Sequence, residues 1–293
     1  MKINHNIFLD EQNYRVNVDE LNRLGFTIIR GIHKDTLNAL KADTTAFIKD
    51  IKKKQPAKNE LYNLINSETS IRRKSNEIVD RYLTPWVKKV FNLNEVDFYP
   101  VSHIIKPFGM KSEIWHQDAA IVDETKDYSL NVWMPLVDSK YLNGCLWVIP
   151  GSHMFNNHHR VFGNGAITKE VLKGVKMHPV YMKRGDILLF HRNIVHGSSN
   201  NYLPWDRIAI EGVLMNKNAT FIKYFATEEN NQLKRYRVEK ELFLNDDPKQ
   251  FVSENNYEYD TIIPKERTEI IADFYSQLNQ FEEHSQHLPD GKW

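Results

Sequence analysis

Between Phe98 and Met215 the sequence consists of short runs of β-branched and aromatic residues separated by turn-forming residues. The separators include Pro107-Phe108-Gly109, Asn143-Gly144, Pro150-Gly151-Ser152, Arg184-Gly185-Asp186 and Asn200-Asn201. This texture predicts many short strands instead of long helices. We expect strands near residues 99–106, 113–121, 128–137, 144–150, 177–182, 186–191, 194–198 and 207–215. About eight short strands is the number that a double-sheet jelly roll requires.

Amphipathic helices are predicted on the N-terminal side of these strands. Apolar residues recur at helical spacing from Leu37 to Ile51 and from about Ser75 to Phe91, and a short strand is expected at Phe26–Arg30. Past Asn216 the chain is charged and irregular until a predicted helix at Lys265–Glu283. We therefore expect a single domain, mainly β with flanking helices. Its parts are a helical N-terminal part (1–97), a double-stranded β-helix core of the jelly-roll, cupin-like type (98–217) and a C-terminal extension (218–293), which could form a lid or a homodimer surface.

Charge and cysteine content exclude several classes of function. The chain has 39 basic and 38 acidic side chains and a net charge of +1, so no overall field draws it to nucleic acid or to an anionic membrane. The basic run Lys49–Lys58 is typical of a solvated helix end. Cys145 is the only cysteine, and the N-terminus has no apolar signal segment. We expect a cytoplasmic protein with a small-molecule substrate and no nucleic-acid or membrane partner.

A candidate metal-binding pair lies in the predicted strand 113–121. His116 and Asp118 are two residues apart, and side chains at that spacing on a strand project from the same face. The same spacing occurs at His33 and Asp35, so the pattern alone is weak. That second pair comes just before a helical pattern, where Asp35 or Thr36 is expected to cap the helix.

A site for Fe(II) would need a second imidazole beside the first pair. The candidates are His103, His153, His158, His159, His178, His191 and His196. We favour His196, because it ends an apolar strand pair and is followed by Gly-Ser-Ser. His191 is five residues earlier and would face away from it. His153 follows a tight turn and is expected to hydrogen-bond to the backbone.

Arg207 is a candidate anchor for an anion. It opens a predicted strand eleven residues beyond His196. An arginine can bind a carboxylate through two parallel N–H groups, which a lysine does less well. By itself it would be read as a strand-end charge paired with Asp206 or Glu211. Beside a metal triad, it is the expected anchor for a dicarboxylate co-substrate.

Three motifs in order resemble those of a known family. They are WHQD at residues 115–118, NGCLWVIPGSH at 143–153, and GDILLFHRNIVHGSS at 185–199, followed by Arg207. In this order they resemble the phytanoyl-CoA dioxygenase family of Fe(II)- and 2-oxoglutarate-dependent oxygenases. The resemblance runs from about Val101 to Leu214, and Leu24–Ile32 is similar to the usual opening of the family. The tail after about Asn218 does not share it.

The resemblance implies a jelly roll with a defined set of site residues. The implied Fe(II) ligands are His116, Asp118 and His196. The implied contacts of 2-oxoglutarate are Arg207, Ser198, Trp133 and Asn131. Gln117 matches a residue close to the reacting groups and is a candidate substrate contact. Trp115 and Trp147 are expected to be core aromatics.

The resemblance also implies a reaction. Fe(II), 2-oxoglutarate and O2 would hydroxylate an unactivated C–H of a small-molecule metabolite, releasing succinate and CO2. Halogenating relatives replace the carboxylate ligand by a small residue, and Asp118 is present here. The alternatives are a non-catalytic jelly-roll protein that binds a ligand, and a cupin-type metalloenzyme that does not use 2-oxoglutarate.

Overall fold

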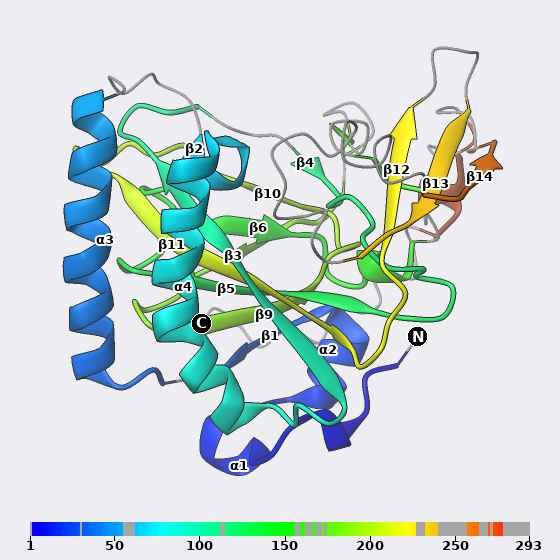
Figure 1. The fold of residues 1–293 in the computed structure, drawn as a ribbon, viewed down its shortest axis with the longest axis horizontal. Coiled ribbons are helices and arrows are strands. Elements are labelled where there is room, and N and C mark those ends of the chain that lie inside the picture. The colour runs from blue at the N-terminus through cyan, green and yellow to red at the C-terminus, as the bar shows by residue number, and fades with distance from the viewer. Residues whose placement is uncertain are drawn as a thin grey trace.

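Two antiparallel sheets form the centre of the molecule, and two long helices cover the outer face of the larger sheet (Figure 1). A core cluster lies between the sheets and includes Trp133 and Ala209 from the larger sheet and Val148 from the smaller one. The computed structural model describes residues 2–29, 31–54, 62–111, 115–155, 159–161, 166–167, 172, 175–226, 232–239, 257–263, 269 and 272–277.

The larger sheet has six strands. Their order is β1 (Phe26–Ile29), β9 (Ile187–His191), β5 (Ser129–Pro135), β11 (Arg207–Asn216), β3 (Val96–Lys106) and β2 (Tyr62–Asn63). All seven residues of the central strand β5 are buried, because one face meets the helices and the other meets the second sheet. The short strand predicted near Phe26 is confirmed as β1, at the edge of this sheet.

The smaller sheet carries two of the predicted metal ligands, His116 and His196. Its order is β7 (Ala166–Ile167), β4 (Trp115–His116), β10 (His196–Ser198), β6 (Leu146–Val148) and β8 (His178–Val180). All eight strands predicted between residues 98 and 215 are present, but the one predicted over 113–121 is far shorter. Strand β4 has only two residues, so Asp118 lies beyond the strand and outside the sheet's hydrogen bonds.

Helices α3 (Lys34–Lys54) and α4 (Thr69–Val90) run side by side in Figure 1 and confirm the two predicted amphipathic stretches. Two shorter helices, α1 (Glu11–Tyr14) and α2 (Val18–Leu24), precede β1. The expected cap at Asp35 or Thr36 is wrong, because α3 begins at Lys34. His33 takes that place, and its Nδ1 accepts the Asp35 backbone N–H at 3.4 Å.

The chain past Asn216 was predicted to be irregular, and this prediction is wrong where the chain forms three strands. β12 (Ile222–Ala226), β13 (Leu233–Arg237) and β14 (Tyr259–Ile262) form a separate antiparallel sheet, at the upper right of Figure 1. Their buried residues are Ile222 and Tyr224 on β12 and Leu233 on β13, too few to give a clear apolar pattern in the sequence.

Part of the predicted C-terminal helix is described, and it is helical over residues 272–277. The remainder of Lys265–Glu283, apart from residue 269, lies outside the described residues. Phe274 is buried, with its ring centroid 5.5 Å from that of Phe155. Their cluster includes Trp115, and Trp147 packs against it, so both tryptophans are core aromatics as predicted. No helix in the described ranges is both long and apolar enough to cross a membrane.

His103 lies in the core beneath the two long helices and not at the metal site. Its side chain is fully buried on β3. Its Nε2 is 3.0 Å from the hydroxyl of Thr44 on α3, and its Nδ1 is 2.8 Å from the hydroxyl of Ser75 on α4. Burial lowers the pKa of His103 to about 4. The ring is therefore a neutral link between the helices and the sheet.

We expect His103 to make the protein less stable as the pH falls. In the unfolded chain His103 is protonated below about pH 6.5, whereas in the folded protein it stays neutral down to about pH 4. The free energy of unfolding is therefore highest above pH 6.5 and decreases as the pH falls from 6.5 to about 4. The loss from this group amounts to roughly 3 kcal/mol. Urea unfolding of wild type and His103→Gln at several pH values checks this. A difference between the two that does not change with pH would contradict it.

Candidate metal centre

His116, Asp118 and His196 come together at one end of the smaller sheet. His116 and His196 are direct partners across β4 and β10, and their ring centroids are 4.3 Å apart. Asp118 Oδ1 lies 3.6 Å from His116 Nε2. One ligand atom from each residue lies within 4.8 Å of the others, and no other such group occurs in the described part of the chain. The structure thus brings the three predicted ligands together.

The protonation states of these residues suit a metal ion. Burial, followed by the charge of His116, lowers the pKa of His196 to about 4. Burial alone would raise the pKa of Asp118, but Arg192 and the two histidines hold it well below its usual range. At neutral pH the site offers a neutral His196 imidazole and an ionised carboxylate, the forms in which these groups bind metals.

Asn131 holds the Asp118 carboxylate. Its Nδ2 donates to Asp118 Oδ2 at 2.5 Å, and its own Oδ1 accepts from Arg192 Nη1 at 2.5 Å. Arg192 Nη1 is also 3.9 Å from Asp118 Oδ2. The predicted contact of Asn131 with 2-oxoglutarate stays a prediction, and the partner observed is the metal ligand. Neither Asn131 in this role nor Arg192 was expected from the sequence.

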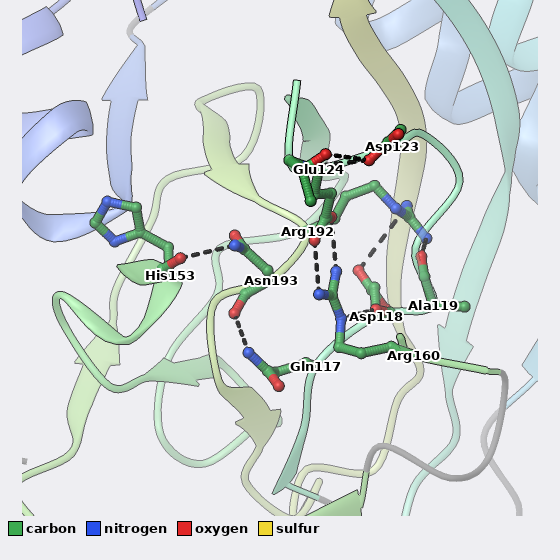
Figure 2. Close-up of polar contacts among 10 residues, drawn as sticks. Gln117, Asp118, Ala119, Asp123, Glu124, His153, Arg160, Arg192 and Asn193 are labelled. Atoms are coloured by element: carbon green, nitrogen blue, oxygen red, sulfur yellow. Dashed lines mark hydrogen bonds and ion pairs between the residues drawn. The ribbon is translucent and has the colours of Figure 1, made fainter. Parts of the chain in front are cut away.

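Gln117 points toward a different set of groups (Figure 2). Its Nε2 donates to the carbonyl of Asn193 at 2.6 Å, and Asn193 Nδ2 donates to the carbonyl of His153 at 2.7 Å. His153 Nε2 lies 3.1 Å from the backbone carbonyl of Asn22, which agrees with the prediction that His153 hydrogen-bonds to the backbone. The substrate role of Gln117 stays a prediction.

The remaining candidate histidines take other partners. His191 stacks on His153 at 4.8 Å, away from the metal site, as predicted. His178 stacks on Phe26 and His159 meets Tyr224 edge-on. His158 lies outside the described residues. The described geometry therefore supports His196 as the second imidazole.

Two buried cations lie opposite each other on neighbouring strands of the larger sheet. Arg207 on β11 pairs directly with Lys106 on β3, and their side chains are 1% and 0% exposed. The Nε and Nη1 atoms of Arg207 have no hydrogen-bond partner among the described residues. Like charges directly opposite each other destabilise a sheet. This arrangement suits a bound anion. Among the described residues Arg207 forms no ion pair with Asp206 or Glu211, and Asp206 pairs with Lys52 instead.

The neighbours of these cations fit the same interpretation. Lys106 Nζ donates to Ser198 Oγ at 2.8 Å, and the Arg207 guanidinium lies over the ring of Trp133 at 5.3 Å. Gly144 has φ +82°, and a Cβ there would lie 2.6 Å from the Lys106 side chain. Lys106 was missed from the sequence. The signal available was a lysine at the end of an apolar strand, which usually indicates a solvated charge.

Glu211 places a further carboxyl group on the face of β11 that carries Arg207. It pairs with Trp133 across β5 and shares the strand face of Arg207. Burial, and then the charge of Asp118, raise its pKa to about 7. Its carboxyl group forms no side-chain hydrogen bond or ion pair with the described residues. The inner face of β11 therefore carries a carboxyl group that interacts electrostatically with Asp118.

These residues fit Fe(II) and 2-oxoglutarate. Two imidazoles and one carboxylate form the donor set of non-haem Fe(II) oxygenases. The unpaired N–H groups of a buried arginine suit one carboxylate of a dicarboxylate, which can bind them in bidentate fashion. A cupin-type metal site has no need of such an anion-binding end.

Comparison with known proteins is consistent with this geometry. A family model described as phytanoyl-CoA dioxygenase matches residues 21–208. Phytanoyl-CoA dioxygenase 1 of Oryza sativa subsp. japonica is 30% identical over 117 residues, 37% of this chain and 41% of the relative. Phytanoyl-CoA dioxygenase of Arabidopsis thaliana is 31% identical over 105 residues, 34% of this chain and 37% of the relative. The chain thus spans about two fifths of the length of these relatives.

A solved structure supports the fold. The non-heme alpha ketoglutarate dependent carbocyclase SnoK from nogalamycin biosynthesis superposes with a TM-score of 0.52. It is 17% identical, and the match covers 73% of this chain and 86% of that one. At that identity the likeness concerns the fold alone. With the two antiparallel sheets, it confirms the predicted jelly roll.

Proposed function

The chain belongs to the phytanoyl-CoA dioxygenase family, and from this premise we propose that it is an Fe(II)- and 2-oxoglutarate-dependent oxygenase. We propose further that it hydroxylates an unactivated C–H of a small-molecule metabolite, with release of succinate and CO2. One observation carries the proposal. A complete His-His-Asp set and a buried, unpaired arginine lie in the same barrel.

We assign the residues to two tasks, binding of the metal and binding of 2-oxoglutarate. His116, Asp118 and His196 would hold the iron. Arg207 and Lys106 would bind the distal carboxylate of 2-oxoglutarate, with Trp133 and Ser198 fixing the two cations. When bound, the iron and its co-substrate supply the oxidant from O2, so the chain itself needs no general base. Its task is to orient the substrate and exclude water.

Asp118 supports hydroxylation over halogenation. A halide would need the position that a carboxylate ligand takes, and Asp118 is present and held by Asn131. The family and the fold leave other oxidations open, since the structural neighbour SnoK is named a carbocyclase. Hydroxylation is therefore the outcome to test first.

We expect the purified protein to form succinate slowly from 2-oxoglutarate when Fe(II), ascorbate and O2 are supplied. Calorimetry should show that 2-oxoglutarate binds more tightly with Fe(II) present, because the co-substrate would contact both the metal and Arg207. Metal binding without 2-oxoglutarate binding would favour the cupin-type alternative. Binding of neither would favour a non-catalytic ligand-binding protein. A metabolite screen scored by faster succinate release would then identify the substrate.

A further inference from the structure

The carboxylate of the proposed metal site lies outside the sheet that carries the two histidines. Strand β4 ends at His116, and Asp118 lies two residues beyond it. The sheet's hydrogen bonds therefore fix His116 and His196, but not Asp118. Its backbone N–H instead donates to the carbonyl of Arg192 at 3.0 Å. The backbone of the segment after His116 must therefore be held by contacts from outside the sheet.

Arg160 makes the missing contacts (Figure 2). Its Nε donates to the backbone carbonyl of Asp118 at 2.7 Å. Its Nη1 and Nη2 each donate to one carboxylate oxygen of Glu124, both at 2.7 Å. The carbonyl of Arg160 accepts the N–H of Ala120 at 3.1 Å. Arg160 thus connects residues 159–161 to the metal-bearing turn, by which we mean the segment from His116 to Ala120, and to Glu124 beyond it.

The Arg160–Glu124 pair is almost completely buried. The two side chains are 0% and 6% exposed. A buried ion pair is weak grounds for expecting added stability, because desolvation offsets most of the attraction. Such a pair is better explained by the geometry that it imposes. Here that geometry includes the backbone of a metal ligand.

We propose that the buried Arg160–Glu124 pair is a positioning device for the metal ligand Asp118. Glu124 orients the guanidinium through both carboxylate oxygens, and the guanidinium fixes the Asp118 carbonyl. Asn131 fixes the carboxylate itself through a separate hydrogen bond. Groups that orient a ligand in this way typically change metal affinity about 10- to 100-fold when removed. The inference rests on the proposed metal site but not on the use of 2-oxoglutarate.

Titration of the metal-free full-length protein with Co(II) tests the proposal. Arg160→Lys keeps the charge but has one nitrogen for three acceptors, so it cannot keep the Asp118 contact together with both Glu124 contacts. We expect a Kd for Co(II) about ten-fold higher, together with an altered visible Co(II) spectrum. Glu124→Gln keeps the shape and removes the charge, and we expect a smaller rise of the same kind. If Arg160→Lys fails to fold, Glu124→Gln alone provides the test.

Two control variants separate positioning from general destabilisation. Val79→Ala empties space in the fully buried face of α4, and Arg81→Lys makes the same chemical change in an exposed ion pair with Asp43. Both should bind Co(II) within about two-fold of wild type, since neither touches the metal-bearing turn. All titrations are run where each variant is fully folded.

The outcomes separate this inference from the proposed function. Unchanged Co(II) affinity and spectrum in both Arg160→Lys and Glu124→Gln would overturn the positioning role, even if the wild type consumes 2-oxoglutarate. Weakened Co(II) binding in these variants, in a protein that never forms succinate, would support the positioning role and refute the oxygenase. A wild-type chain that does not bind Co(II) would overturn both.

Discussion

Replacement of Asp118 by alanine should abolish succinate formation and weaken metal binding at least about 100-fold, the upper end of what loss of a ligand's supporting group costs. The variant would leave two imidazoles and no negative charge to balance the metal ion. It would also leave Asn131 and Arg192 without the carboxylate that they now hold. Turnover of 2-oxoglutarate and Co(II) titration measure the two losses.

Asp123→Ala is the matched control, since it removes the same group five residues along the chain. Asp123 accepts from the backbone and hydroxyl of Thr125 and has no place among the three ligands. We expect near wild-type metal affinity from it. Full turnover in Asp118→Ala, or an equal loss in both variants, would refute Asp118 as a ligand.

The cluster of His116, Asp118 and His196 was predictable because it depends on local periodicity and on motif order. His116 and Asp118 have the spacing of one strand face, and His196 ends an apolar run before Gly-Ser-Ser. The exact position of Asp118 was not predictable. The run 113–121 looks continuous, whereas of its described residues 115–121 the sheet pairs only Trp115 and His116. The support of Asp118 then comes from residues distant in the sequence.

Those supporting residues share a reason for being missed. Lys106 is buried only because β3 pairs with β11 in a register that places it opposite Arg207. Arg160 and Glu124 are 36 positions apart, and each looks like a solvated loop charge in the sequence. Charged residues are rarely buried unless paired, so from a single sequence such residues are predicted to be exposed. In the folded protein, tertiary contacts bury Lys106, Arg160 and Glu124.

The same limit applies to the fold. Eight strands of the jelly roll were predicted because their apolar runs are bounded by turn residues. Strands β12 to β14 were not, because β12 and β13 bury only three residues between them and β14 buries none. The order of strands within each sheet depends on pairing between distant segments, which no local pattern contains.

Arg207→Met should raise the KM for 2-oxoglutarate by about 100-fold or more, because truncating one partner of a buried charge pair commonly costs 2–5 kcal/mol. Methionine keeps much of the length and the packing against Trp133 but has no N–H to donate. The metal site lies on other strands, so Co(II) affinity should stay close to wild type. Steady-state kinetics with varied 2-oxoglutarate, beside a Co(II) titration, measure both. A normal KM would refute the anchor.

Lys106→Met distinguishes an anion-binding site from an ordinary structural pair. In the protein without 2-oxoglutarate, Lys106 and Arg207 are like charges in direct register, so removing one should leave the unfolding temperature unchanged or raise it. The same substitution should reduce the rise in unfolding temperature that 2-oxoglutarate produces, since ligand stabilisation follows affinity. Stability and ligand response would then move in opposite directions, as expected where buried charge is retained for function. If Lys106→Met instead destabilises the ligand-free protein and leaves the 2-oxoglutarate response intact, the paired cations serve the fold and not the co-substrate.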